Sequence, residues 1–226
     1  MVSKLRLTLG ILLLGFVIEG TFEAYTYINH SYQLPFASLI FILGPFVTLA
    51  GLAILWIGRF EWDELLSRRF RHAHWAFALN IMALVLAIAP VVWYGLLSAA
   101  SIPSWVDWEF GVAVVSSLLF TYATYVLVAF ELTAGLSKAL LFIAFGWASF
   151  VSIWIGDALS QEFGTIVLIV QNRTLDLSPV SESISSKESY LAVTYLLLTI
   201  AYLHAYHRSH SRAPKSPSAA VAPGAR

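Results

Sequence analysis

Long, nearly uncharged apolar stretches recur along this chain and constrain its fold more than any other feature. Crossing the hydrocarbon core of a membrane as a helix takes about 20 mostly apolar residues. Six stretches of the 226-residue sequence meet this requirement, and polar or charged residues separate them. The expected spans are residues 5–28, 36–60, 74–100, 110–132, 139–159 and 190–206. The sequence therefore predicts an all-α integral membrane protein built as a six-helix transmembrane bundle.

The composition agrees with a membrane protein and excludes several other classes. Apolar residues make up 59% of the chain and charged residues 12%, whereas soluble proteins average about 45–50% and about 25%. A single soluble core of this size cannot hide that excess, which excludes a soluble enzyme. The formal net charge is zero, so the sequence lacks the basic surface of a nucleic-acid-binding protein. The absence of cysteine excludes disulfides and thiolate chemistry.

The distribution of Lys and Arg predicts how the six spans are oriented. Cytoplasmic connections of membrane proteins are enriched in these residues. With six spans, all 13 Lys and Arg residues except Arg173 and Lys187 fall on one side. We therefore expect both termini in the cytoplasm and the protein in the plasma membrane. Residues 211–226 are rich in Ala, Pro and Ser, which is typical of a disordered tail.

The opposite side has the features of an extracytoplasmic surface. Asn29 and Asn172 each begin an N-x-[ST] sequon, and both fall on this side as candidate glycosylation sites. The one long connection joins the fifth and sixth spans and contains a β-prone apolar run, 165–170, followed by an alternating segment, 174–178. This pattern predicts a β-hairpin over the outer face. Re-entry of residues 163–170 into the membrane is the alternative, since so short a segment cannot span it.

Three acidic residues within the predicted spans are the strongest functional candidates. An ionised side chain in the membrane costs about 2.5–3.5 kcal/mol on insertion scales. Glu19 and Glu23 are four residues apart and share one helix face, and Asp157 lies at a comparable level in the fifth span. If the three carboxylates meet in the outer half of the bundle, they would share protons or hold a cation. Otherwise Glu23 and Asp157 are hydrated in the headgroup region and Glu19 is a neutral structural acid.

Small residues recur at every fourth position of the fifth predicted span. Ala144, Ala148, Ser152 and Gly156 form a continuous ridge on one helix face. Small side chains let a neighbouring backbone approach closely. We therefore expect this ridge to be a packing interface, and a membrane-protein partner or a second copy of the chain is a candidate for contacts of this kind.

The sequence favours transport over catalysis. It contains no nucleophile motif, phosphate-binding Gly-rich loop or zinc-protease motif, and its six histidines lie at the predicted membrane boundaries. We therefore predict no cofactor and no resident metal. The leading hypothesis is that the bundle moves or couples a cation or proton. The alternative is a non-catalytic subunit or assembly factor of a larger membrane complex, and a membrane enzyme ranks third.

Overall fold

The computed structural model describes residues 2–29, 53, 68–97, 101–172 and 178–211, and every element in this part of the chain is helical. The long helices are α1 (Val2–Asn29), α4 (Arg68–Val92), α5 (Ser104–Phe130), α6 (Leu136–Gln161) and α9 (Leu191–Ser211). The shorter elements are the π-helical turn η1 (Trp93–Leu97) and the helices α7 (Phe163–Gln171) and α8 (Ser178–Glu188). The all-helical class is thus confirmed for the described residues. The predicted second span, 36–60, and the predicted disordered tail lie outside them.

Four of the described helices are long and apolar enough to cross a membrane. They cover Leu5–Tyr25, Arg71–Leu97, Ser104–Phe130 and Leu136–Gln161. These segments correspond to the predicted first, third, fourth and fifth spans. Helix α9 contains residues 191–206 of the predicted sixth span but is not one of the four, because the histidines and the arginine in its second half lower its hydropathy. The count of six spans therefore stays a prediction.

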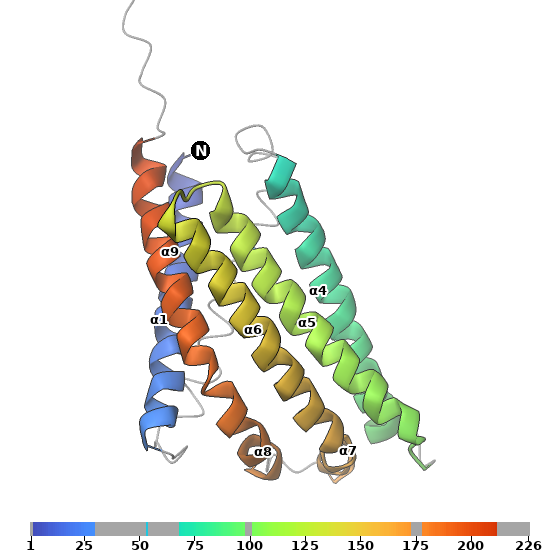
Figure 1. Cartoon of the computed structure of the whole chain (residues 1–226). Coiled ribbons are helices and arrows are strands. Elements are labelled where there is room, and N and C mark those ends of the chain that lie inside the picture. The colour runs from blue at the N-terminus through green and yellow to red at the C-terminus, as the bar shows by residue number, and fades with distance from the viewer. Residues whose placement is uncertain (1, 30–52, 54–67, 98–100, 173–177, 212–226) are drawn as a thin grey trace, which may run out of the picture.

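The long helices pack side by side in the order α1, α9, α6, α5 and α4 (Figure 1). The first turns of α1, α4 and α6 and the last turns of α5 and α9 lie at the same end of this row (Figure 1). These turns and the residues next to them contain Arg6, Arg71, Lys138 and Arg208. We call this the basic end, and the other, where α7 and α8 lie, the opposite end.

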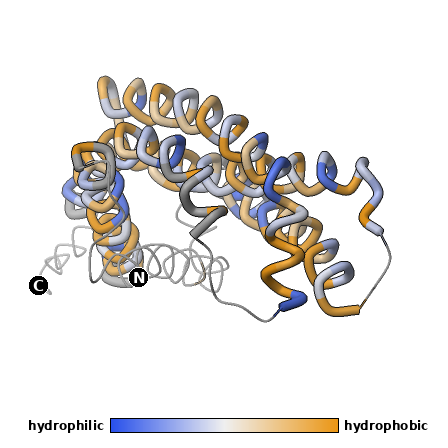
Figure 2. Tube along the Cα trace, turned by 90° about the horizontal axis from the view of Figure 1, so that it is seen from below, coloured by the Kyte–Doolittle hydropathy of each residue, from blue (hydrophilic) through white to orange (hydrophobic). Residues whose placement is uncertain are grey.

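Many large apolar residues of the long helices are exposed, and hydrophobic residues predominate along these helices in Figure 2. Met82 and Val85 are more than half exposed on α4, and Phe142 and Ile153 are more than half exposed on α6. Exposed apolar surface of this extent is unfavourable in water but matches the hydrocarbon of a bilayer. The exterior and the four apolar helices together indicate a membrane-embedded multi-pass protein.

The β-hairpin predicted between the fifth and sixth spans is wrong over residues 165–171, which belong to helix α7. Branched apolar residues favour strands mainly when they pack on a sheet, and here no sheet is available among the described residues. Phe163 and Val167 are instead one helical turn apart and are buried beside Val106 and Phe110 of α5. This packing decides the conformation. Residues 173–177 lie outside the described part of the chain.

Candidate functional site

The charges of Glu19 and Glu23 of α1 interact with a third carboxylate toward the opposite end of the bundle, which belongs to Glu188 of α8. The charges of Glu188 and Glu19 both act on Glu23, and that of Glu19 acts on Glu188. Glu23 is only 6% exposed, and Glu19 and Glu188 are partly buried. We call these three residues the carboxylate cluster.

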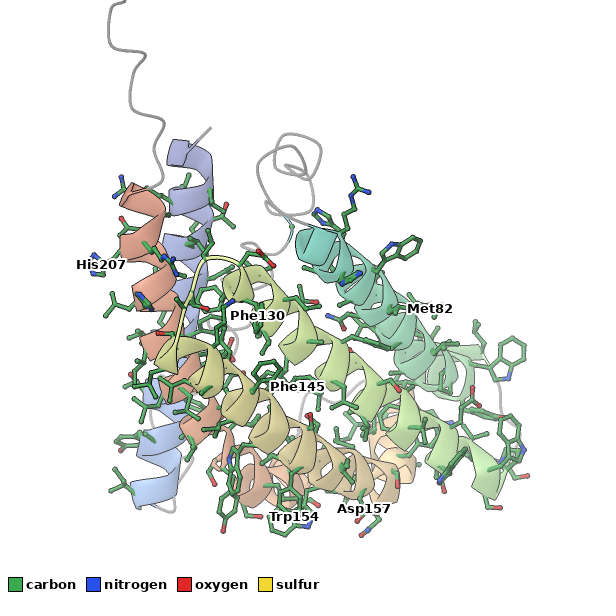
Figure 3. The ribbon with its side chains drawn as sticks, turned by 45° about the horizontal axis from the view of Figure 1, so that its top comes forward. Met82, Phe130, Phe145, Trp154, Asp157 and His207 are labelled. Carbon is green, nitrogen blue, oxygen red and sulfur yellow. The ribbon has the colours of Figure 1, made fainter. Side chains whose placement is uncertain are left out.

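The structure does not bring Asp157 to this cluster. Its side chain is exposed on α6 and accepts a hydrogen bond from Gln161 Nε2 at 3.0 Å. Figure 3 shows Asp157 near the lower end of α6, pointing away from the bundle. The order of the helices explains the separation, because α9 lies between α1 and α6.

Two tyrosine hydroxyls adjoin the carboxylate cluster. The Tyr195 hydroxyl of α9 donates a hydrogen bond to the Glu19 carboxylate. The hydroxyl oxygens of Tyr195 and Tyr122 are 3.5 Å apart, and either group can donate to the other. Both tyrosines are buried, where a phenol needs such partners. The hydroxyls therefore extend the polar cluster from α1 into the interior of the bundle.

Close contacts between helices hold the members of the site in place. A Cβ atom on Gly20 would lie 3.0 Å from the Tyr195 Cβ, so the absence of a side chain at Gly20 lets α9 approach α1 beside the cluster. Glu188 is the last residue of α8, and α9 begins three residues later. The Trp147 indole donates to the Tyr190 carbonyl at 2.8 Å and so ties this turn to α6.

The environment of Glu188 changes its titration. Burial, followed by the nearby charge of Glu19, raises the pKa of the Glu188 carboxyl from 4.5 to about 7. Its carboxyl therefore changes protonation near neutral pH, whereas an exposed glutamate stays ionised there. A group with this behaviour is suited to accept and release protons.

Aromatic rings fill the bundle between the carboxylate cluster and the basic end. The fully buried Phe16 ring packs edge-on against the rings of Tyr125 and Tyr202, with centroid separations of 4.8 Å in both cases. The Tyr202 hydroxyl donates to the Tyr125 carbonyl at 2.7 Å. Nearer the basic end, Ser137 Oγ and His204 Nδ1 are 2.6 Å apart.

The small-residue ridge of α6 is buried along its whole length. Ala144, Ala148, Ser152 and Gly156 are all inaccessible or nearly so. A Cβ atom on Gly156 would overlap the Val115 side chain of α5. At this position the ridge therefore packs against a helix of the same chain.

A polar contact between α4 and α5 lies within the membrane-spanning segments. Asn80 Nδ2 donates to Thr121 Oγ1 at 2.8 Å, and Ser117 Oγ donates to Asn80 Oδ1 at 2.7 Å. Asn80 is 6% exposed, and both ends of its amide are hydrogen bonded. These bonds join two helices, as buried amides do in membrane proteins.

The remaining sequence candidates lie apart from the cluster. Asn172 is exposed directly after α7, and Asn29 is the last residue of α1. Within the described residues, no group of three His, Asp or Glu side chains has an arrangement that holds a metal ion.

The sequence did not single out Glu188, Tyr122 or Tyr195 as members of the site. Glu188 lies in a polar connecting segment, whose position along the chain gives no information about depth. Tyr122 did carry a signal, because it lies in the middle of an apolar stretch, where a hydroxyl requires a hydrogen-bond partner.

No family model matches the chain, and no curated protein or solved structure is significantly similar to it. Its class follows from its own fold. Four described helices of spanning length and an apolar exterior define a multi-pass helical membrane protein.

Proposed function

We propose that this protein moves or couples protons, or another cation, through its helix bundle, with the carboxylate cluster as the binding group. The observation that supports the proposal is the mutual charge interaction of Glu19, Glu23 and Glu188 in a mostly apolar bundle. Acidic side chains in membrane domains are costly and are typical of ion and proton pathways. Adjacent carboxylates repel one another when all are ionised, so a shared proton or a bound cation stabilises them.

The surroundings of the cluster favour protons over other cations. Glu188 changes protonation near neutral pH and is only partly buried, so it is suited to exchange protons with water. The hydroxyls of Tyr195 and Tyr122 can each donate and accept a hydrogen bond, and they continue inward from Glu19. The Phe16 ring packs against the rings of Tyr125 and Tyr202, and in this proposal it would move to let a proton pass toward the basic end.

The decisive experiment is Glu19→Gln in proteoliposomes that contain a pH-sensitive dye. Glutamine keeps the size of the side chain and its hydrogen bonding but removes the exchangeable charge. We expect this variant to fold normally and to lose dye-detected flux under an imposed pH gradient. Asp157→Asn is the matched control, because it removes an exposed carboxylate outside the cluster. A folded Glu19→Gln protein with full flux, or an equal loss in Asp157→Asn, would contradict the proposal.

The alternative is a non-catalytic subunit or assembly factor of a larger membrane complex. Here the carboxylates would serve only the contacts of α1 with α8 and α9, and the exposed apolar face of α4 would bind a protein in place of lipid. Purified parent protein without flux, joined by a stoichiometric membrane-protein companion in mild detergent, would favour this alternative.

A further inference from the structure

A groove of about 430 Å³ lies between α1 and α9 at the basic end. Its lining residues are Arg6, Leu7, Gly10, Ile11, Leu14 and Tyr206. The five lining residues from α1 lie at positions 6, 7, 10, 11 and 14. Residues three or four positions apart share a helix face, so these five form a single stripe on α1. The stripe is roughly 12 Å long, since a helix rises about 1.5 Å per residue. The groove therefore has a cation at one end and an apolar surface along the rest.

Arg6 occupies the end of the groove at the depth of the lipid headgroups. It lies in the first turn of the membrane-spanning segment Leu5–Tyr25, where long cationic side chains reach the interface. Its guanidinium carbon lies 5.2 Å from the centroid of the Tyr206 ring, and its Nη2 donates to the Tyr206 hydroxyl at 3.4 Å.

The hydrogen-bonding capacity of Arg6 is only partly used within the described part of the chain. Its Nε is buried and has no hydrogen-bond partner there. A guanidinium has five N–H donors in a geometry that matches a phosphate or carboxylate. Arg6 as a whole is partly exposed, so an anion at this end of the groove would accept hydrogen bonds from the accessible N–H groups of the guanidinium.

The apolar part of the groove is largely exposed. Leu7 and Leu14 are 61% and 55% exposed. Among the described residues, a Cβ atom on Gly10 would meet only Tyr206, at the ordinary contact distance of 3.7 Å. The depth of the groove therefore depends on the missing side chain of Gly10, and a long side chain there would fill it.

We propose that this groove binds one anionic glycerophospholipid, with its phosphate at Arg6 and one acyl chain along Leu7, Gly10 and Leu14. The cation selects a lipid of net negative charge, and the apolar stripe selects a lipid over free phosphate. Attraction of a single interfacial Arg for anionic lipid corresponds to a preference of about fivefold over a zwitterionic lipid.

The experiment is native mass spectrometry of the full chain, released from nanodiscs of mixed phosphatidylglycerol and phosphatidylcholine. We expect the parent to retain phosphatidylglycerol about fivefold over phosphatidylcholine. Arg6→Gln should lose this preference, and Gly10→Leu should retain less of both lipids. Arg71→Gln is the matched control, because Arg71 is an exposed arginine at the same end that does not line the groove. Gly10→Ala, which adds one methyl group, should behave as the parent.

Further variants and one competitor make the result decisive. Leu14→Gln changes an exposed lining position and tests the acyl-chain contact even if Gly10→Leu fails to fold. Glycerol 3-phosphate has the headgroup phosphate without acyl chains, and we expect it not to displace the lipid. An unchanged preference in Arg6→Gln, an equal loss in Arg71→Gln, or displacement by glycerol 3-phosphate would each overturn the proposal.

Discussion

A carboxyl group that titrates near neutral pH makes the stability of its protein depend on pH in a defined direction. The Glu188 pKa of about 7 in the folded protein exceeds its ordinary value of 4.5. Between these values the folded chain binds more protons than the unfolded chain does. The free energy of unfolding therefore falls as pH rises through this window. The destabilisation of the folded protein by the Glu188 carboxyl is absent below about pH 4.5 and is fully present above about pH 7.

We therefore expect the purified protein to melt at a higher temperature at pH 5 than at pH 8. Glu188→Gln should raise the melting temperature at pH 8 and reduce the difference between the two conditions. A change of about 1 kcal/mol corresponds to a shift of roughly 2–4 °C in a chain of this size. Thermal unfolding in detergent measures the effect, with Asp157→Asn as the control. If Glu188→Gln keeps the full pH dependence of the parent, another group is responsible for it.

The amide of Asn80 gives a second test at the level of single residues. Asn80→Ala removes two hydrogen bonds between α4 and α5. The hydroxyl of Thr121 already donates to the Ser117 carbonyl within its own helix, which limits the loss. We expect a destabilisation of about 0.6–2 kcal/mol, the range for hydrogen bonds between membrane helices. Unfolding in detergent should show no comparable change for Asn172→Ala, whose side chain is exposed.

The contact between α5 and α6 is tested by adding one methyl group. Gly156→Ala places a Cβ atom on the Val115 side chain, and we expect a destabilisation of about 1–3 kcal/mol from overpacking. Val115→Ala should restore part of that loss when the two changes are combined. Gly146→Ala is the matched control on the same helix, because a Cβ there meets nothing within 4 Å in the described part of the chain. Equal stability of the Gly156 and Gly146 variants would mean that the close approach at Gly156 is not rigid.

The sequence predicts the long helices because spanning length and apolarity are local properties. It places the start of the fourth span late, at residue 110, because Asp107 and Glu109 resemble loop residues. In the structure α5 begins at Ser104 after Pro103, and the acids occupy its first turns, where the helix dipole favours negative charge. The hairpin fails for a different reason, since burial of Phe163 and Val167 depends on contacts with α5 that are distant in sequence.

The same distinction between local and distant contacts applies to the site. The spacing of Glu19 and Glu23 predicts a shared helix face, and their charges do interact in the structure. The third carboxylate depends on which helix lies beside α1, and this is set by packing. The missing side chain of Gly20 gives a local reason for another helix to approach α1 at this point. That this helix is α9 follows only from the position of Tyr195 in the structure.

At the scale of the whole molecule, the lengthwise direction of the helices defines two ends that a membrane would separate. The last turn of α1 lies at the opposite end and the first turn of α4 at the basic end (Figure 1). We therefore expect Ile28→Cys and His72→Cys, both at exposed positions, to face opposite sides of the membrane. The predicted span over residues 36–60 lies between these two positions in the chain. Labelling of both positions from the same side would therefore contradict a single membrane crossing between them.

Absence of cysteine makes the orientation itself measurable without background, because each introduced thiol is the only one in the chain. Ser101 and Ser186 are exposed toward the opposite end, whereas Ala134 and His207 are exposed toward the basic end. If the basic end faces the cytoplasm, as the distribution of Lys and Arg predicts, a membrane-impermeant maleimide will label Ser101→Cys and Ser186→Cys in intact cells. Ala134→Cys and His207→Cys will react only after permeabilisation. The reverse pattern would invert the orientation, while labelling of His207→Cys in intact cells together with Ser186→Cys would show that α9 does not cross the membrane.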